Sequence, residues 1–181
     1  GCDSAEGIRQ AVRYLWSKGH DRIGFLGGEP DSIVTIERKQ AYSDALAELG
    51  LVEDPAAVKY GCFSAKGTKK RILEIAETGV TAVVCISDLL ACTAVKELIH
   101  AGYSVPEDIS VTGYDNLPPS EYSQPPITTL SQNRIHIGKM TFFMLQQMKN
   151  GIRIKSLMLR PELIERESVR EICSRELPKE K

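Results

Sequence analysis

The sequence lacks a basic excess, long apolar runs and paired cysteine motifs. It carries 23 Lys and Arg residues against 24 Asp and Glu residues, a net charge of −1, whereas a surface that binds nucleic acid by itself usually shows a basic excess. No apolar run approaches the roughly 20 residues of a membrane span, and no signal peptide opens the chain. The five cysteines form no CxxC pair, which fits a reducing cytoplasm. We therefore expect a cytoplasmic chain that contacts neither DNA nor a membrane directly.

The motifs of common catalytic, metal and nucleotide sites are also missing. Gly27 and Gly28 follow an apolar run, but neither the GxGxxG spacing nor the P-loop lysine pattern is present. The three histidines show no HxH or HExxH spacing. No GxSxG elbow or Cys–His signature stands out. We therefore predict that the protein is not an enzyme and that it uses no metal and no cofactor.

What the sequence does contain is an alternation of strand and helix patterns, in 181 residues that suffice for one sizeable core. Apolar runs predict strands over residues 21–28, 58–63, 81–86 and 109–113. Amphipathic spacing predicts helices over residues 4–18, 33–49 and 64–77, and another directly after residue 88. This alternation predicts an α/β fold, with a parallel sheet and helices on both faces.

The rhythm changes after Pro125 and Pro126. Residues 127–130 are predicted as a brief extended segment, and residues 133–149 as a long helix. The apolar positions of that helix are Ile137, Met140, Met144 and Met148, with Phe143 beside them. Residues 157–164 alternate like an edge strand, and the tail beyond Val169 is charged and expected to fray.

Polar side chains end two consecutive strands of the predicted sheet. Ser87 and Asp88 follow the strand at 81–86, and Asp115 follows the strand at 109–113. Small ligands bind at the carboxyl ends of parallel strands, so this edge is a candidate ligand site. Asp88 and Asp115 could also act as a paired acid and base. Capping is favoured for Asp88, because a helix starts there, and ligand contact for Asp115, because its loop holds two prolines and starts no obvious helix.

Two further residues have open roles. Arg38 lies one turn beyond a strand-end loop, so its guanidinium could reach ligand oxygens or remain a solvated helix charge. Phe63 ends the third predicted strand at the same sheet edge. It could stack on a sugar or base face, or pack against the next helix.

Taken together, a series of segments resembles the lactose-repressor (LacI/GalR) family of bacterial transcription regulators. The similar segments, in family order, are GHDRIGFLGG (19–28), the helix around residue 38 with AYSDAL, GCFSAKG (61–67), TAVVCISDLLACTAVKEL (81–98), VPEDISVTGYDN (105–116), PPITTLSQNRIHIGK (125–139) and LRPELIERESV (159–169). They cover residues 3 to about 170. The set is specific, whereas no single segment is.

The resemblance implies an effector-binding fold like that of the periplasmic binding proteins (type I), of which this chain has mostly the C-terminal lobe. Residues 1–130 are expected to form that lobe, and residues 154–170 its final strand region. Residues 131–153 would be a return helix that belongs to the N-terminal lobe, and residues 171–181 a charged tail. The family's helix-turn-helix headpiece has no counterpart in this sequence.

Carried over by position, the resemblance implies a ligand site in the cleft between lobes. Its residues are Arg38, Phe63, Ser87, Asp88 and Asp115. Arg134 stands where some members carry an aromatic residue, which leaves an anionic effector open beside the expected sugar or sugar derivative.

The implied function is that of the effector-binding and dimerisation region of a DNA-binding regulator, with a repressor as the leading expectation. Its expected partners are a small-molecule effector, a second copy of the chain and operator DNA, the last through the absent headpiece. The alternative is a periplasmic-type solute-binding protein, which would share the fold and the cleft.

Overall fold

A six-stranded sheet forms the centre of the computed structural model, which describes residues 1–61, 65–153, 157–175 and 177. The strands are β1 (Ile23–Gly27), β2 (Val58–Tyr60), β3 (Ala82–Cys85), β4 (Ser110–Tyr114), β5 (Thr128–Ser131) and β6 (Glu162–Ile164). Their order is β2-β1-β3-β4-β5-β6. The first five are parallel, and β6 is antiparallel to β5. The predicted parallel sheet is confirmed, and β6 is the edge strand expected within residues 157–164.

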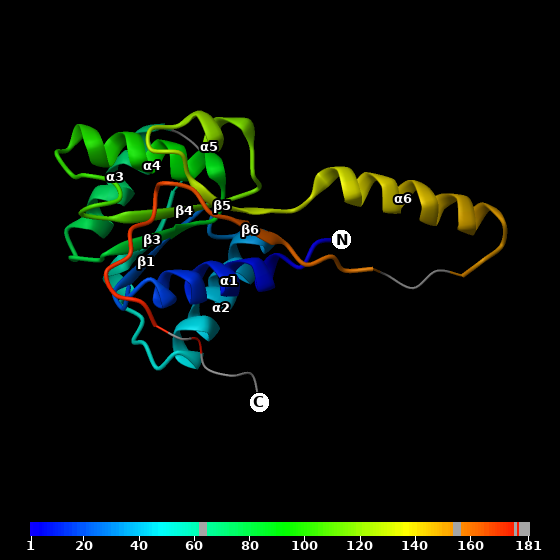
Figure 1. Ribbon diagram of the computed structural model, residues 1–181, viewed down its shortest axis with the longest axis horizontal. Coiled ribbons are helices and arrows are strands. Elements are labelled where there is room, and N and C mark those ends of the chain that lie inside the picture. The colour runs from blue at the N-terminus through cyan, green and yellow to red at the C-terminus, as the bar shows by residue number, and fades with distance from the viewer. Residues whose placement is uncertain (62–64, 154–156, 176, 178–181) are drawn as a thin grey trace.

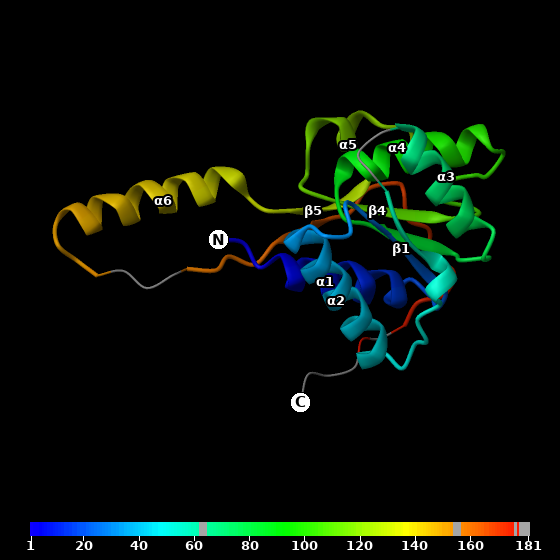
Figure 2. The ribbon, with the colours of Figure 1, turned by 180° about the vertical axis from the view of Figure 1, so that it is seen from behind.

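Helices cover both faces of this sheet, as Figures 1 and 2 show. One face carries α1 (Ser4–Ser17) and α2 (Ile33–Glu48), and the other carries α3 (Ala65–Ala76), α4 (Asp88–His100) and α5 (Pro118–Tyr122). A 3-10 turn, η1 (Pro55–Ala57), precedes β2, and α6 (Arg134–Lys149) follows β5. The expectation that no helix starts in the loop after β4 was wrong, because α5 begins there with proline in its first turn, a position that needs no amide donor.

The core lies between the central strands and the apolar stripes of the helices. Every residue of β1, β3 and β4 is buried, which is typical of parallel strands that are covered on both faces. The stripe of α1 has helical spacing and consists of Ile8, Ala11, Val12 and Leu15. Asp3 caps this helix by accepting the Glu6 amide at 2.9 Å. Gly19 ends it with a φ of +93°.

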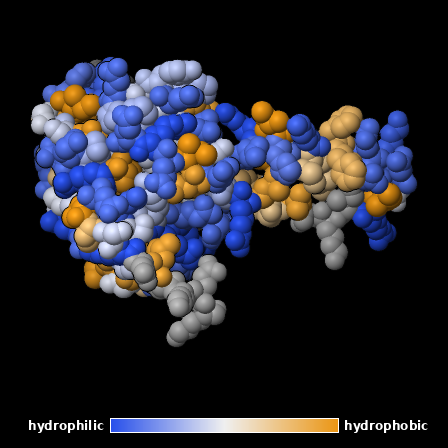
Figure 3. All heavy atoms as spheres, in the orientation of Figure 1, coloured by the Kyte–Doolittle hydropathy of each residue, from blue (hydrophilic) through white to orange (hydrophobic). Residues whose placement is uncertain are grey.

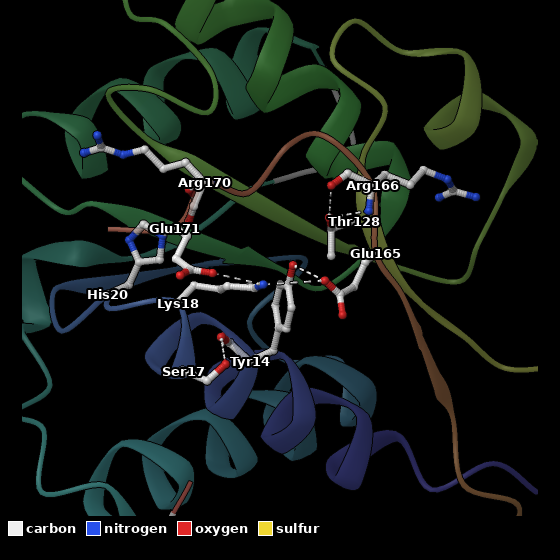
Figure 4. Close-up of polar contacts among 10 residues, drawn as sticks. Tyr14, Ser17, Lys18, His20, Thr128, Glu165, Arg166, Arg170 and Glu171 are labelled. Carbon is white, nitrogen blue, oxygen red and sulfur yellow. Dashed lines mark hydrogen bonds and ion pairs between the residues drawn. The ribbon is translucent and has the colours of Figure 1, made fainter. Parts of the chain in front are cut away.

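The segment after β6 bonds to β5 and β4 and then reaches the C-terminal end of α1, where it is fixed. Figure 4 shows the contacts between them: the Tyr14 hydroxyl donates to Glu165 at 3.0 Å, and Lys18 pairs with Glu171 at 3.5 Å. The Ile172 amide donates to the Lys18 carbonyl at 2.7 Å. The tail was expected to fray beyond Val169, and this was wrong as far as Arg175, because the amides of Ile172, Cys173 and Arg175 bond to the Ser17 and Lys18 carbonyls at the end of α1.

The helix α6 leaves the body as an arm (Figures 1 and 2). None of its 16 residues is buried. Apolar side chains gather along it in Figure 3, and its most exposed large apolar residues are Ile135, Phe142, Phe143, Leu145 and Met148. The predicted helix is confirmed, but its apolar side chains are not covered by the part of the chain that the structure describes.

Candidate ligand-binding site

A cavity of about 340 Å³ opens at the carboxyl ends of the central strands, beside the first turns of α2. Its lining consists of Ser32, Val34, Thr35, Arg38, Ile86, Ser87 and Asp115. Three of these, Arg38, Ser87 and Asp115, were predicted as ligand contacts. They follow β1, β3 and β4, which are neighbours in the sheet, and parallel pairing brings the ends of these strands to one edge.

Arg38 enters the cavity from the second turn of α2. Only 6% of the residue is exposed, which excludes a solvated helix charge. Its Nη1 donates to the Ile86 carbonyl, and the guanidinium carbon lies 3.7 Å from the centroid of the Tyr114 ring. Nε has no hydrogen-bond partner among the described residues. Burial lowers the pKa of Arg38, while Tyr114 and Asp115 oppose this shift. Arginine stays charged in proteins, so a buried cation with an unused donor lines the cavity.

Asp115 is placed at the cavity by a tight turn after β4. Its φ is +108° and that of Asn116 is +49°, conformations that residues other than glycine rarely adopt. Its amide donates to the Leu130 carbonyl at 2.8 Å, and its Oδ1 accepts from Gln132 Nε2 at 2.6 Å. Within the described chain Oδ2 accepts no hydrogen bond. Burial raises the pKa of Asp115, whereas Arg38 and Gln132 favour the ionised form. One carboxylate oxygen is therefore available to a ligand.

The sequence left helix capping and ligand contact open for Ser87 and Asp88, and the structure gives the two residues different roles. Ser87 is the N-cap of α4 and accepts the Leu90 amide at 3.3 Å. Asp88 lies in the first turn and is fully buried. Its Oδ2 accepts the Leu117 amide at 2.6 Å, and its Oδ1 accepts the Thr129 hydroxyl at 2.5 Å. The structure thus corrects two expectations: Asp88 does not cap the helix with its side chain, and it lies behind the cavity wall rather than on it.

Arg38 and Asp115 give the cavity one donor group and one acceptor group of opposite charge. They form no direct ion pair within 4.0 Å. A hydroxyl group can accept a hydrogen bond from a guanidinium and donate one to a carboxylate, so hydroxyls fit between the two. The hydroxyl of Ser87 adds a group that can do either. The lining therefore offers donors and acceptors for a polar ligand.

Comparison with known proteins identifies the family of this chain. The profile of the periplasmic binding protein-like domain matches residues 12–169. The chain belongs to the periplasmic binding protein-like domain family.

Individual members of this family refine the assignment. The chain is 35% identical over 173 residues to the HTH-type transcriptional repressor PurR of Vibrio atlanticus (strain LGP32), across 93% of this chain and 52% of that protein. A sugar-binding transcriptional regulator (LacI family) from Escherichia coli, complexed with phosphate, superposes with a TM-score of 0.86 at 28% identity, across 94% of this chain and 62% of that one. For a complex of the transcriptional regulator CelR with cellobiose the TM-score is 0.82 at 32% identity, across 92% and 52%.

These similarities confirm the predicted resemblance to the LacI/GalR regulators. The region of similarity is the effector-binding domain of such repressors. The chain spans about half the length of the curated relatives it matches.

Two further site residues expected from the resemblance remain to be placed. Phe63 lies outside the described residues, so its stacking role stays a prediction. Arg134 begins α6, and its Nη2 donates to the Asn116 carbonyl at 3.3 Å. Arg134 therefore contacts the turn that carries Asp115 and does not line the cavity.

Sequence reasoning missed several residues at this cavity. Ser32, Val34 and Thr35 line the cavity, and Gln132 orients the Asp115 carboxylate. A signal existed for Ser32, because serine before a helix pattern marks an N-cap that faces a strand-end loop. Its side chain makes no capping hydrogen bond. Val34 and Gln132 carry no local signal, because their roles depend on neighbours that are distant in the sequence.

The buried histidine His20 is held by contacts within the protein and does not line the cavity. His20 is fully buried, with Nδ1 at 2.9 Å from the Thr81 hydroxyl and Nε2 at 3.2 Å from the Arg170 carbonyl. Burial lowers its pKa. Across residues 1–61, 65–153, 157–175 and 177, no group of three or more His, Cys, Asp or Glu side chains could hold a metal ion. Over the same ranges, no helix has the length and apolar character needed to cross a membrane.

Proposed function

We propose that this chain is the effector-binding part of a sugar-responsive LacI-family repressor. The supporting observation is the pair formed by buried Arg38 and half-buried Asp115, which line one cavity without forming an ion pair. In this proposal Arg38 and Asp115 hold adjacent hydroxyls of the ligand, and Ser87 contributes a third polar contact. Phe63 is proposed to stack on the ligand ring.

The charge balance of the site favours a neutral polyhydroxylated ligand. In the described part of the cavity lining, Arg38 is the one cation and Asp115 the one anion, so their charges balance. A ligand without net charge keeps this balance. A phosphate group close to Asp115 would meet a like charge at short range, which is unfavourable in a buried site. Arg134 could attract an anion, but its side chain already donates to the Asn116 carbonyl. A sugar or sugar derivative therefore fits better than a phosphorylated ligand.

The mechanism follows from the proposed arrangement of two lobes. Residues 1–130 and 154–170 form the C-terminal lobe, and residues 131–153 return to the N-terminal lobe. A ligand between the lobes favours one lobe angle only if it binds that state more tightly than the other. In a cytoplasmic homodimer, that angle sets the spacing of two DNA-binding headpieces on operator DNA. The headpieces belong to the part of such regulators that lies outside this chain.

A periplasmic-type solute-binding protein is the second candidate, because it would use the same cleft. Similarity to named transcriptional repressors and regulators supports the first candidate over this one. The full gene distinguishes the two: a helix-turn-helix upstream of Gly1 supports the regulator, and a secretion signal there supports the solute-binding protein.

A thermal-shift screen of the full-length protein tests the proposal. The panel contains D-glucose, D-ribose, cellobiose, glucose 6-phosphate and adenine. A ligand at 100 times its Kd stabilises the folded state by about 2.7 kcal/mol, so a binding sugar raises the melting temperature by several degrees. Arg38→Met and Asp115→Asn each remove a charge-assisted hydrogen bond and should weaken binding about 10- to 100-fold.

The matched control is Arg71→Met, which removes an arginine on α3 that pairs with Glu74 and lies outside this cavity. It should leave the shift unchanged. Sugar binding that survives both Arg38→Met and Asp115→Asn would contradict the proposed site. Shifts with glucose 6-phosphate alone would show that the ligand is anionic.

A further inference from the structure

The turn that carries Asp115 has positive φ values, which Asp and Asn adopt more readily than other residues with a Cβ but still at a cost. Asp115 and Asn116 both have positive φ values, +108° and +49°. Residues with a Cβ adopt such conformations at a cost in energy, and they persist only where surrounding contacts hold them. The contacts that hold this turn therefore determine where the Asp115 carboxylate lies.

Asp88 supplies the buried contacts on the far side of this turn. Its Oδ2 accepts the Leu117 amide at 2.6 Å. Its Oδ1 accepts the Thr129 hydroxyl at 2.5 Å, and the Thr129 oxygen in turn accepts the Asn116 amide at 3.4 Å. The two amides that follow Asp115 in the chain are thus both fixed, one directly by Asp88 and one through Thr129. Hydrogen bonds to an ionised carboxylate are about twice as strong as neutral ones.

The surroundings of Asp88 are built to keep a carboxylate at this position. The space it occupies exists because residue 113 is glycine: a Cβ there would lie 2.3 Å from Asp88 Oδ1. Arg166 donates to the Asn116 side chain at 2.8 Å and its charge favours the ionised form of Asp88. Burial acts in the opposite direction and raises the pKa of Asp88.

We propose that Asp88 is a positioning residue of the ligand site: with Thr129 it holds the 115–117 turn in the conformation that places the Asp115 carboxylate at the cavity. Asp88 does not touch the ligand, because it is fully buried, both of its oxygens are bonded to the protein, and it is not part of the cavity lining. The inference rests on the function proposed above, in which Asp115 binds a ligand hydroxyl.

Solution NMR of the full-length protein without ligand tests this role. The φ of Asp115 is obtained from its three-bond HN–Hα coupling and backbone chemical shifts, and the side-chain amide resonances of Gln132 report the Asp115 carboxylate that it contacts. In Asp88→Ala, we expect Asp115 to leave the positive-φ region and the Gln132 amide resonances to shift as they do in Asp115→Ala. Exchange of the Leu117 amide with solvent should become at least about tenfold faster, since its acceptor is lost.

The conservative variant Asp88→Asn separates positioning from general stabilisation. Its amide oxygen can still accept the Leu117 amide and its NH2 can donate to Thr129, so the wild-type φ of Asp115 and Gln132 resonances should return. If Asp88→Ala does not fold, Thr129→Val removes only the hydroxyl link and should shift the same signals. A folded Asp88→Ala or Thr129→Val protein with unchanged Asp115 φ and Gln132 resonances would overturn the inference. Because these readouts need no ligand, a failed sugar screen contradicts the proposed function alone.

Discussion

Replacing Gly113 by alanine should destabilise the protein far more than most glycine-to-alanine changes. Gly113 lies in β4 directly beneath the buried Asp88 carboxylate. An alanine Cβ would lie 2.3 Å from Asp88 Oδ1, about 0.7 Å inside the 3.0 Å that real contacts require, and 3.3 Å from Ala91 and Ile127. Asp88 cannot retreat freely, because both of its oxygens hold hydrogen bonds of 2.5 and 2.6 Å.

The size of the effect follows from these two constraints. Forcing one extra methyl into a packed core costs about 1–3 kcal/mol. Losing one hydrogen bond to a charged group adds about 1.5–3 kcal/mol. We therefore expect Gly113→Ala to lower the free energy of unfolding by about 3–5 kcal/mol, which lowers the melting temperature by roughly 10 °C for a chain of this size.

Urea unfolding followed by far-UV circular dichroism measures the change. The matched control is Gly138→Ala in the exposed helix α6, where an added Cβ meets nothing within 4 Å. Alanine favours a helix over glycine by about 1 kcal/mol, so the control should be neutral or stabilising. A Gly113→Ala protein that loses less than about 1 kcal/mol would refute the argument that the Asp88 carboxylate fills this space.

Two further predictions concern buried polar groups. Because burial lowers the pKa of His20, its contribution to stability is fully present above the ordinary pKa of about 6.5 and declines as the unfolded chain takes up the proton below it. Guanidinium unfolding between about pH 7.5 and 5.5 should therefore show a smaller loss of stability in His20→Gln than in wild type, and equal losses would contradict this. Ser168→Ala removes a hydroxyl that donates to the Val111 carbonyl at 2.6 Å and accepts the Thr128 amide at 2.8 Å. It should cost about 1–3 kcal/mol in urea unfolding, and a neutral result would mean that water replaces the hydroxyl.

The order of helices and strands could be predicted from the sequence because each is specified locally. The spacing of apolar residues and the glycine stop at Gly19 placed α1 to within a residue of its observed end. The near-continuous apolar run of β3 is typical of a strand covered on both faces, which is how the structure has it. The short α5 was missed because two prolines favour a turn as much as a first helical turn.

The division of roles within the site could not be predicted in the same way. Asp88 and Asp115 both follow an apolar strand, and their local sequence predicted helix capping for Asp88 rather than the buried contacts that it makes. The difference arises from partners that are 29 and 41 residues away from Asp88, the Leu117 amide and the Thr129 hydroxyl. Such contacts appear only once the sheet register is known, because the pairing of β4 with β5 brings Thr129 opposite Gly113.

The attachment of α6 has a mechanical consequence. Its root is joined to the 115–116 turn by Gln132, which holds Asp115, and by Arg134, which holds the Asn116 carbonyl. A 16-residue helix is about 24 Å long at 1.5 Å per residue. A tilt of about 10° at the root would carry the far end through about 4 Å. The helix therefore amplifies small movements of the turn that carries the Asp115 carboxylate. A surface in contact with its far end would be displaced by several times the movement at the turn.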